Sequence, residues 1–266
     1  METTYSADGT RIAYDRTGSG PSLVLITGAF GDRNTTKALS ALLAAHLSVL
    51  EYDRRGRGNS GDVQPYAPER EIEDLAAVIA AGGGEAGVFG HSSGGALGLE
   101  AASRGLPIAG VVAYEPPYTT ADDGEPSDVP QRVAAHIAAG RRREAIETFL
   151  TDAVGVPPAM FPTIENSPDF PGMLAIAHTL PYDLTICGDG RVPAGRLARI
   201  AVPTLLVDGA NSPPWAARVA DAVAAAIPGA SRRTLQGQDH GAAPEVIAPV
   251  IVEFLAKVEV RAPRAQ

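Results

Sequence analysis

The stretch from Val88 to Ala96 constrains the fold of this chain more than any other. It reads Val-Phe-Gly-His-Ser-Ser-Gly-Gly-Ala. Gly90, Ser92 and Gly94 have the spacing of a nucleophile elbow, a sharp strand-to-helix turn that exposes the hydroxyl of its central serine above a sheet. Glycines are needed on both sides because the strand and helix backbones come too close for a Cβ. Since apolar residues precede the turn and an alanine-rich segment follows it, we predict strand, turn and helix rather than a plain glycine-rich loop.

Length, charge and cysteine content limit the possible fold, partners and location of this chain. The 266 residues suffice for one α/β domain with an insertion. The net charge of −9 and the pI of about 5.0 argue against nucleic acid and membrane as partners. We expect a cytoplasmic protein, because the N-terminus lacks the pattern of a secretory signal and no stretch approaches the roughly 18 apolar residues of a membrane span. Cys187 is the only cysteine, which excludes an internal disulfide.

Short apolar runs alternate with helical segments along most of the chain. Continuously apolar runs such as Leu23–Ile26 are typical of strands that are covered on both faces. The predicted strands are 3–5, 11–15, 23–26, 47–52, one ending at the elbow, 108–114, 203–208 and 231–235, and the predicted helices are 37–45, 70–81, 96–103, 215–226 and 244–258. Pro249 should kink the last helix or delay its start. The alternation predicts a mostly parallel sheet with helices on both faces.

One block interrupts this alternation. Residues 118–199 contain no clear strand. Their longest helical segment should break or bend at Gly140, and residues 157–171 hold too many prolines for a regular element. Ligands of open parallel sheets bind beyond the carboxyl ends of the strands. Because the block leaves from that edge, we predict a core of residues 1–117 and 200–266 with a helical cap of residues 118–199 over the pocket.

Five stretches together carry a resemblance to a known family. They are Leu23–Phe30, Asp-Arg-Arg-Gly-Arg-Gly-Asn-Ser at 53–60, Gly-His-Ser-Ser-Gly-Gly at 90–95, Val-Pro-Thr-Leu-Leu-Val-Asp-Gly at 202–209 and Gly-Gln-Asp-His at 237–240. In this order the chain resembles the α/β-hydrolase family over nearly its whole length, and most of all its small, cap-bearing bacterial serine hydrolases of unassigned substrate. The resemblance implies the α/β-hydrolase fold with an inserted helical cap, but it says little about the substrate.

A serine hydroxyl at neutral pH needs an adjacent base before it can act as a nucleophile, and the base needs an orienting partner. His240 is the candidate base for Ser92, because it lies after the last predicted strand and before the closing helix, where the family keeps its catalytic histidine. The neighbouring His91 is less suited, because the elbow geometry should bury it at the sheet edge.

The acid that orients His240 is where the sequence departs from the commonest family pattern. An acid is usual three residues after the glycine of the 202–209 stretch, and that position is Ser212. The family has a second location, at the end of the strand after the nucleophile helix, where this chain has Glu115. We therefore predict Glu115 as the third member, with Asp208, or a Ser-His pair helped by Asn211 or Ser212, as alternatives.

Family resemblance also assigns the oxyanion hole, the amide groups that stabilise charge on the substrate oxygen. The N–H groups of Ser93 and Ala29 are the predicted donors. Thr27 stands where a histidine is frequent in the family, which leaves the anchoring of the loop around Ala29 open. The residues expected to line the substrate pocket are Phe30, Trp215 and His178, with Met160, Phe161 and Tyr182 as further candidates.

These residues predict a serine hydrolase that needs no cofactor or metal and cleaves an ester, lactone or thioester of a small, fairly apolar molecule through an acyl-enzyme on Ser92. Two alternatives stay open. The same fold could perform lyase, carbon–carbon hydrolase or cyclase chemistry, or it could bind a ligand without catalysis, because no acid occupies position 212. We expect a small-molecule substrate and a monomer or homodimer.

Overall fold

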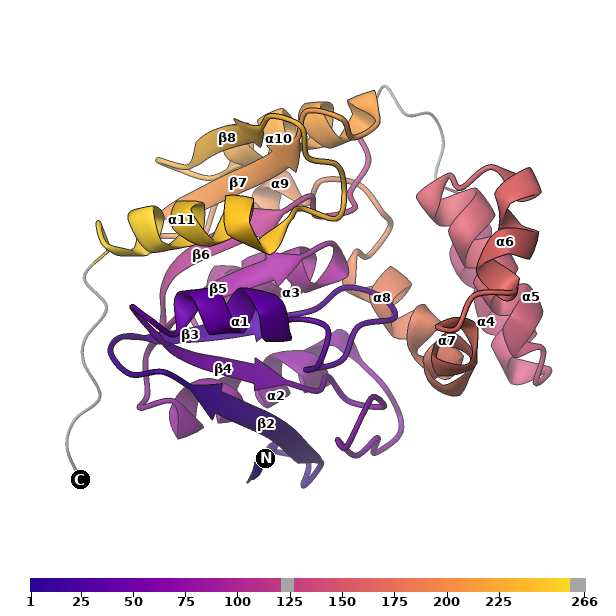
Figure 1. Cartoon of the computed structure of the whole chain (residues 1–266), viewed down its shortest axis with the longest axis horizontal. Helices are drawn as coiled ribbons and strands as arrows, with labels where there is room; N and C mark the ends of the chain where they lie inside the picture. Colours follow the sequence, from indigo (N-terminus) through magenta and orange to yellow (C-terminus); the bar gives the residue numbers. More distant parts are fainter. Residues whose placement is uncertain (121–126, 259–266) are drawn as a thin grey trace.

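Eight strands form one central sheet, and the computed structural model describes residues 1–120 and 127–258 (Figure 1). The strand order is β1-β2-β4-β3-β5-β6-β7-β8. The pairs β1–β2 and β2–β4 are antiparallel and the remaining pairs are parallel, so the prediction of a mostly parallel sheet is confirmed. The strands are β1 (Glu2–Tyr5), β2 (Arg11–Thr17), β3 (Ser22–Ile26), β4 (Ser48–Tyr52), β5 (Ala86–His91), β6 (Ile108–Tyr114), β7 (Thr204–Gly209) and β8 (Ser231–Leu235).

Helices cover both faces of this sheet (Figure 1). They are α1 (Lys37–Leu43), α2 (Pro68–Ala81), α3 (Ser93–Ser103), α10 (Pro214–Ala226) and α11 (Pro244–Leu255). The last of these begins at its predicted residue and includes Pro249, so this proline does not delay the helix start. Among the helices of the described residues, none is both long enough and apolar enough to cross a membrane.

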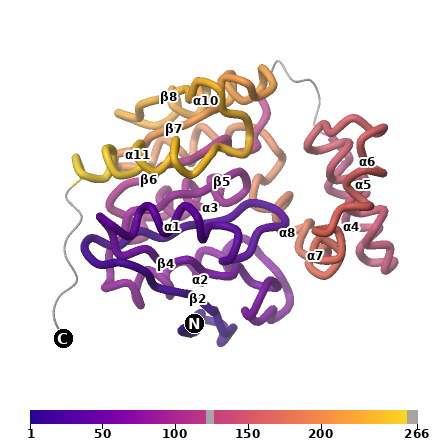
Figure 2. Tube along the Cα trace, in the orientation of Figure 1, coloured from indigo at the N-terminus to yellow at the C-terminus, as the bar shows by residue number. Residues whose placement is uncertain are grey.

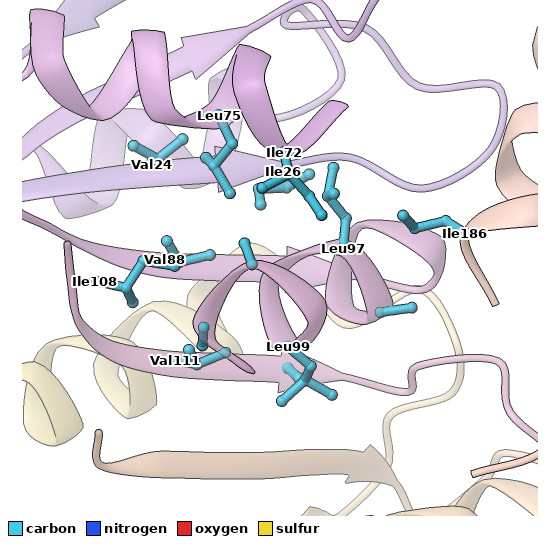
Figure 3. Packing of buried hydrophobic residues seen from close by; sticks show 14 of the residues in the cluster. Val24, Ile26, Ile72, Leu75, Val88, Leu97, Leu99, Ile108, Val111 and Ile186 are labelled. Carbon is cyan, nitrogen blue, oxygen red and sulfur yellow. The ribbon is translucent and has the colours of Figure 1, made fainter. Parts of the chain in front are cut away.

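The core lies in two layers, because the central strands β3, β4 and β6 are buried along their whole length. On one face, α2, α3 and α10 pack against Val24, Val88 and Val111, as Figure 3 shows for α2 and α3. On the other face, α1 and α11 pack against residues such as Leu25 and Val112. These layers fix the carboxyl ends of the parallel strands, where the candidate site lies.

The chain between β6 and β7 is helical in its described part, and we call its helices the inserted helices. They are α4 (Val129–Ala138), α5 (Arg142–Thr148), the π-helical η2 (Phe149–Val154), the 3₁₀ turn η3 (Pro158–Met160), α6 (Phe161–Glu165), α7 (Phe170–Ile176), the 3₁₀ turn η4 (Ala177–Thr179), α8 (Leu180–Ile186) and α9 (Ala194–Leu197). Figures 1 and 2 show α4 to α7 beyond the carboxyl ends of the parallel strands, with α8 between them and the sheet. Buried side chains such as Val133, Ile146 and Leu180 give them a small core of their own.

The prolines of the inserted helices do not prevent helix formation, contrary to the prediction from the sequence. The prediction that residues 157–171 are too rich in proline for a regular element is wrong, because η3, α6 and the start of α7 occupy them. The prolines within these helices lie at the first or second position, where the missing N–H has no partner to lose. The expected break at Gly140 is present, since this residue has φ of 72° between α4 and α5.

Candidate active site

Ser92 sits in a strained backbone conformation between β5 and α3. Its φ is 54° and its ψ is −124°, a combination that side-chain-bearing residues rarely adopt. The surrounding glycines permit this turn, because a Cβ on Gly90 would overlap the carbonyl of Gly94 and one on Gly94 would overlap the carbonyl of Ile26. The Ser92 N–H donates to the Tyr114 carbonyl at 2.9 Å. The strand, turn and helix predicted for this stretch are therefore present in the structure.

Glu115 and His240 meet directly next to this turn. Glu115 follows β6 with a φ of 45°, and the residue is 1% exposed. Its Oε2 lies 2.6 Å from Nδ1 of His240, although the two residues are 125 positions apart. Its Oε1 accepts hydrogen bonds from the Gly209 N–H at 2.8 Å and the Ser212 hydroxyl at 2.6 Å. The structure thus brings together the glutamate and the histidine that the sequence analysis paired.

The surroundings of Glu115 decide its charge. Burial acts to raise the pKa of the carboxyl, but hydrogen bonds from His240, Ser212 and the Gly209 N–H outweigh it and hold the pKa below its usual range. The group is therefore a carboxylate at neutral pH and can only accept hydrogen bonds. It follows that His240 carries its proton on Nδ1, which leaves Nε2 as the basic nitrogen.

The alternative acids have other partners. Asp208 accepts hydrogen bonds from Arg232, at 2.9 and 3.0 Å, and from the Thr234 hydroxyl. Asp239 accepts the Gly241 N–H at 2.9 Å, so its carboxylate closes its own loop. Ser212, which stands where an acid is common in the family, supplies a hydroxyl to Glu115 instead. Because Glu115 contacts His240, none of these alternatives is needed to give the histidine a charged partner.

His91 has a role that the sequence reasoning did not find. Its Nε2 lies 2.7 Å from the backbone carbonyl of His240, and the two rings are 4.6 Å apart between centroids. Burial, followed by the nearby His240, lowers the pKa of His91 to about 4. A carbonyl can only accept, so the neutral ring donates its Nε2–H and holds the loop that carries His240. The only sequence signal for this role is the position of His91 directly before Ser92.

The loop after β3 presents the other predicted oxyanion donor. Phe30 has a φ of 60°, and the Thr27 hydroxyl donates to the Gly31 carbonyl at 3.3 Å, so this threonine ties the loop to itself. Gly28 lies against Ser92, since a Cβ there would come within 2.9 Å of the Ser92 Cβ. Ala29 therefore follows a residue in contact with the elbow, while Ser93 is the first residue of α3.

The predicted pocket residues lie in different places. A cavity of about 380 Å³ is lined by residues that include Ala29, Phe30 and His91, but Trp215 and His178 are not among its lining residues in the described part of the chain. The Trp215 ring lies 6.3 Å from the His240 ring. His178 lies 3.8 Å from an Asp62 carboxylate oxygen, at the turn after β4.

The further pocket candidates, which belong to the inserted helices, also differ in their surroundings. Phe161 belongs to the core of the inserted helices and is 1% exposed, whereas Met160 is 50% exposed. The Tyr182 hydroxyl is held between Gln64 and Asp62. Phe30 contacts the inserted helices edge-on through Phe149, at 5.6 Å between ring centroids. Phe30 is therefore the predicted pocket residue that joins the cavity to these helices.

A sequence profile described as the alpha/beta hydrolase family matches residues 23–250, which is most of the chain. The chain belongs to this family. An α/β hydrolase from Sphaerobacter thermophilus has a similar structure, with a TM-score of 0.91 and 50% identity over 96% of this chain and 100% of that one. The confirmed fold is thus an α/β-hydrolase fold.

Two curated relatives match shorter stretches of this α/β hydrolase. The uncharacterized hydrolase YraK of Bacillus subtilis is 33% identical over 105 residues, 38% of this chain and 39% of that protein. The putative carbamate hydrolase RutD of Azorhizobium caulinodans is 36% identical over 91 residues, 34% of each chain. The chain thus spans between one third and two fifths of these relatives, which support a hydrolase without assigning a substrate.

Proposed function

We propose that this α/β hydrolase is a serine hydrolase that cleaves an ester, lactone or thioester through an acyl-enzyme on Ser92. The observation that carries the proposal is the 2.6 Å contact between His240 Nδ1 and the buried carboxylate of Glu115, beside the strained turn at Ser92. A histidine that is oriented by a carboxylate and lies beside a serine is the arrangement required to activate a hydroxyl nucleophile.

In the proposed cycle, Nε2 of His240 takes the proton of the Ser92 hydroxyl as its oxygen attacks the substrate carbonyl. The imidazolium then passes this proton to the departing alcohol or thiol, which leaves an acyl group on Ser92. Water adds to the acyl carbon while His240 again accepts a proton, and release of the acid returns that proton to Ser92. Glu115 stabilises the imidazolium in both halves of the cycle.

The oxyanion of each tetrahedral intermediate is assigned to the N–H groups of Ala29 and Ser93. Preorganised amides aimed at developing charge commonly provide the largest single contribution to such reactions. The first residue of a helix, as at Ser93, also offers the positive end of the helix dipole.

The substrate is proposed to be small and fairly apolar. Next to the site, a cavity of about 380 Å³ is lined by apolar groups such as Phe30, Leu39 and Ile247. Its lining includes Ala29 and His91 but, within the described residues, neither Ser92 nor His240. Residues 118–199 are proposed to cover the site as a cap over a core of residues 1–117 and 200–266. Trp215, whose ring lies 6.3 Å from that of His240, stays a proposed contact for the substrate, as does His178.

A fluorophosphonate probe tests the activated serine. We expect the folded wild-type protein to gain one adduct by intact mass and Ser92→Ala to gain none, and a panel of short-chain p-nitrophenyl esters and lactones to be turned over by the wild type only. Absence of an adduct on the folded wild type would contradict the serine nucleophile. An adduct without turnover of any acyl substrate would favour lyase or cyclase chemistry instead.

A further inference from the structure

The turn after β4 buries three arginines, Arg54, Arg55 and Arg57, each 1% exposed. Buried guanidinium groups are costly unless each is paired and hydrogen-bonded. Arg54 binds Glu71 of α2 through two hydrogen bonds of 2.6 and 2.7 Å. The arginines of this turn therefore bind groups of the protein itself.

Arg57 links the loop of the proposed oxyanion hole to the inserted helices. Its Nη2 donates to both carboxylate oxygens of Asp183, at 2.8 and 2.7 Å. Its Nη1 donates to the Gly28 carbonyl at 2.6 Å and to the Gly31 carbonyl at 3.3 Å. One guanidinium group thus fixes two carbonyls of the loop and one carboxylate on α8.

The contact with Gly28 determines where the Ala29 N–H points. The Gly28 carbonyl and the Ala29 N–H belong to one planar peptide unit, and in the trans form that non-proline peptides adopt they point in opposite directions. Arg57 at the carbonyl therefore orients the N–H on the far side. It also polarises this N–H, because hydrogen bonds in series strengthen one another.

The second proposed donor is tied to the same carboxylate. The Ser93 hydroxyl donates to Oδ1 of Asp183 at 2.6 Å and accepts from Nη1 of Arg54 at 3.0 Å. The same Nη1 also donates to the Thr27 carbonyl at 3.2 Å and to Oδ1 of Asp183 at 2.8 Å. Asp183 thus contacts Ser93 directly and reaches the loop before Ala29 through the arginines.

Asp183 comes from the segment between β6 and β7, and its helix is anchored in the core. Ile186, at the end of α8, packs into the cluster of buried residues around α2 and α3 (Figure 3). The Asp183 side chain is 2% exposed. Burial opposes its ionisation, but Arg57 and Arg54 hold the pKa of this carboxyl below its usual range, so it carries a full charge at neutral pH.

We propose that Asp183 is a positioning residue that, through Arg57 and Ser93, aligns both amide donors of the oxyanion hole, so that oxyanion stabilisation requires α8 to be docked on the core. The inference rests on the proposed function. The inference adds a structural condition to that function. A residue of the inserted helices, remote from the proposed triad in sequence, determines how strongly the oxyanion hole stabilises the charge on the substrate oxygen.

Asp183→Asn tests this positioning role, with Asp74→Asn as a matched control. Asp74 is 1% exposed and binds Arg55 of the same turn through two hydrogen bonds of 2.8 Å. The other bonds of Arg55 run to Asp8 and to the carbonyls of Val63 and Arg70, away from the oxyanion loop. Asp183→Asn removes the carboxylate that Arg57 binds, and Asp74→Asn removes one of the two carboxylates that Arg55 binds, so a loss of thermal stability is expected in both variants.

Kinetic measurements distinguish a loss of alignment in the oxyanion hole from a loss of stability. For a p-nitrophenyl ester we expect Asp183→Asn to lower kcat by about 10- to 100-fold with KM little changed, since the loss of one oxyanion donor costs roughly 100-fold or more. Affinity for a trifluoromethyl ketone, which forms a tetrahedral adduct with an activated serine, should fall by the same factor. Asp74→Asn should retain kcat within about threefold.

Amide NMR resonances provide a test that does not depend on catalysis. In Asp183→Asn the N–H resonances of Ala29 and Ser93 should shift, whereas in Asp74→Asn they should coincide with the wild type. If the wild-type protein is inert toward every ester and probe, the proposed function fails while these resonances still test the alignment. Unchanged resonances, or equal losses of kcat in both variants, would overturn the positioning role.

Arg57→Lys is the second variant if Asp183→Asn does not fold. Lysine keeps the charge beside Asp183, but its single ammonium cannot reproduce the planar fork that bridges a carboxylate and two carbonyls. We expect the same fall in kcat and the same shift of the Ala29 resonance. Failure of both variants to fold, with Asp74→Asn folded, would overturn the proposal by making the pair a requirement of the fold.

Discussion

Replacement of Glu115 by glutamine would exchange one carboxylate oxygen for an amide nitrogen and move the ring proton of His240 from Nδ1 to Nε2. In the wild type, Oε1 accepts from the Gly209 N–H and the Ser212 hydroxyl while Oε2 accepts from His240. The Gly209 N–H can only donate, so the amide oxygen of the substituted side chain must face it. The amide NH₂ then faces Nδ1 of His240, which becomes an acceptor and moves the ring proton to Nε2, where it blocks proton transfer from Ser92.

The expected fall in kcat of Glu115→Gln comes from two interactions. Turning the amide to restore the productive tautomer leaves the Gly209 N–H buried and unsatisfied, at about 2 kcal/mol. The imidazolium also loses a charged hydrogen bond worth about 2 kcal/mol. A barrier raised by about 4 kcal/mol corresponds to a kcat lower by about 10³-fold.

The assay is hydrolysis of the best ester from the substrate panel by Glu115→Gln, with Asp208→Asn as the control. Asp208 is as deeply buried as Glu115 but binds Arg232 and Thr234, so its variant should keep kcat within about threefold. Thermal melts of both variants establish that they fold. Activity of Glu115→Gln within about tenfold of the wild type, or a greater loss in Asp208→Asn, would refute the assignment of the glutamate.

Three further changes have defined outcomes. Ser212→Ala removes one hydrogen bond to Glu115 and should lower kcat about fivefold, or about 1 kcal/mol of barrier, in the same ester assay. Because the folded pKa of His91, about 4, lies below its ordinary value of 6.5, the unfolded chain binds the extra proton first, so stability should fall as pH drops from about 6.5 to 4 and level off below. Urea titrations should show a flatter pH profile for His91→Gln, and an equally steep profile would contradict this role. Gly209→Ala should lower kcat by about 10-fold or more, since its Cβ would lie 2.5 Å from the Gln238 carbonyl oxygen and displace the loop that carries His240. A crystal structure of this variant with that loop unmoved would exclude this cause.

Local periodicity and strand order made much of the fold predictable from the sequence. The runs at 108–114 and 231–235 form β6 and β8 with their predicted bounds, because strand-forming residues between turn residues are a local signal. Glu115 could be placed at a strand end in the same way. Its two other partners, Gly209 and Ser212, could not be predicted, because their contacts depend on how β7 lies beside β6.

The remaining features depend on context that a local pattern does not contain. The prolines of residues 157–171 disfavour helix interiors, yet those within helices are accommodated at helix starts. The buried pairs of Arg54 and Arg57 with Asp183 join residues more than 120 positions apart. Charged residues at such separations carry no periodic signal, so the burial of Asp183 could not be expected from its place in the chain.

Phe30, Ser92 and Glu115 are the non-glycine residues with positive φ in the described chain, and each follows a strand at the proposed site. Left-handed backbone costs of order 1 kcal/mol or more for residues with a side chain. Glycine at these positions would relieve that cost, but it would also remove the Phe30 ring, the proposed nucleophile Ser92 and the carboxylate of Glu115. At Ser92 the relieved cost should therefore make the glycine variant of this protein both more stable and inactive.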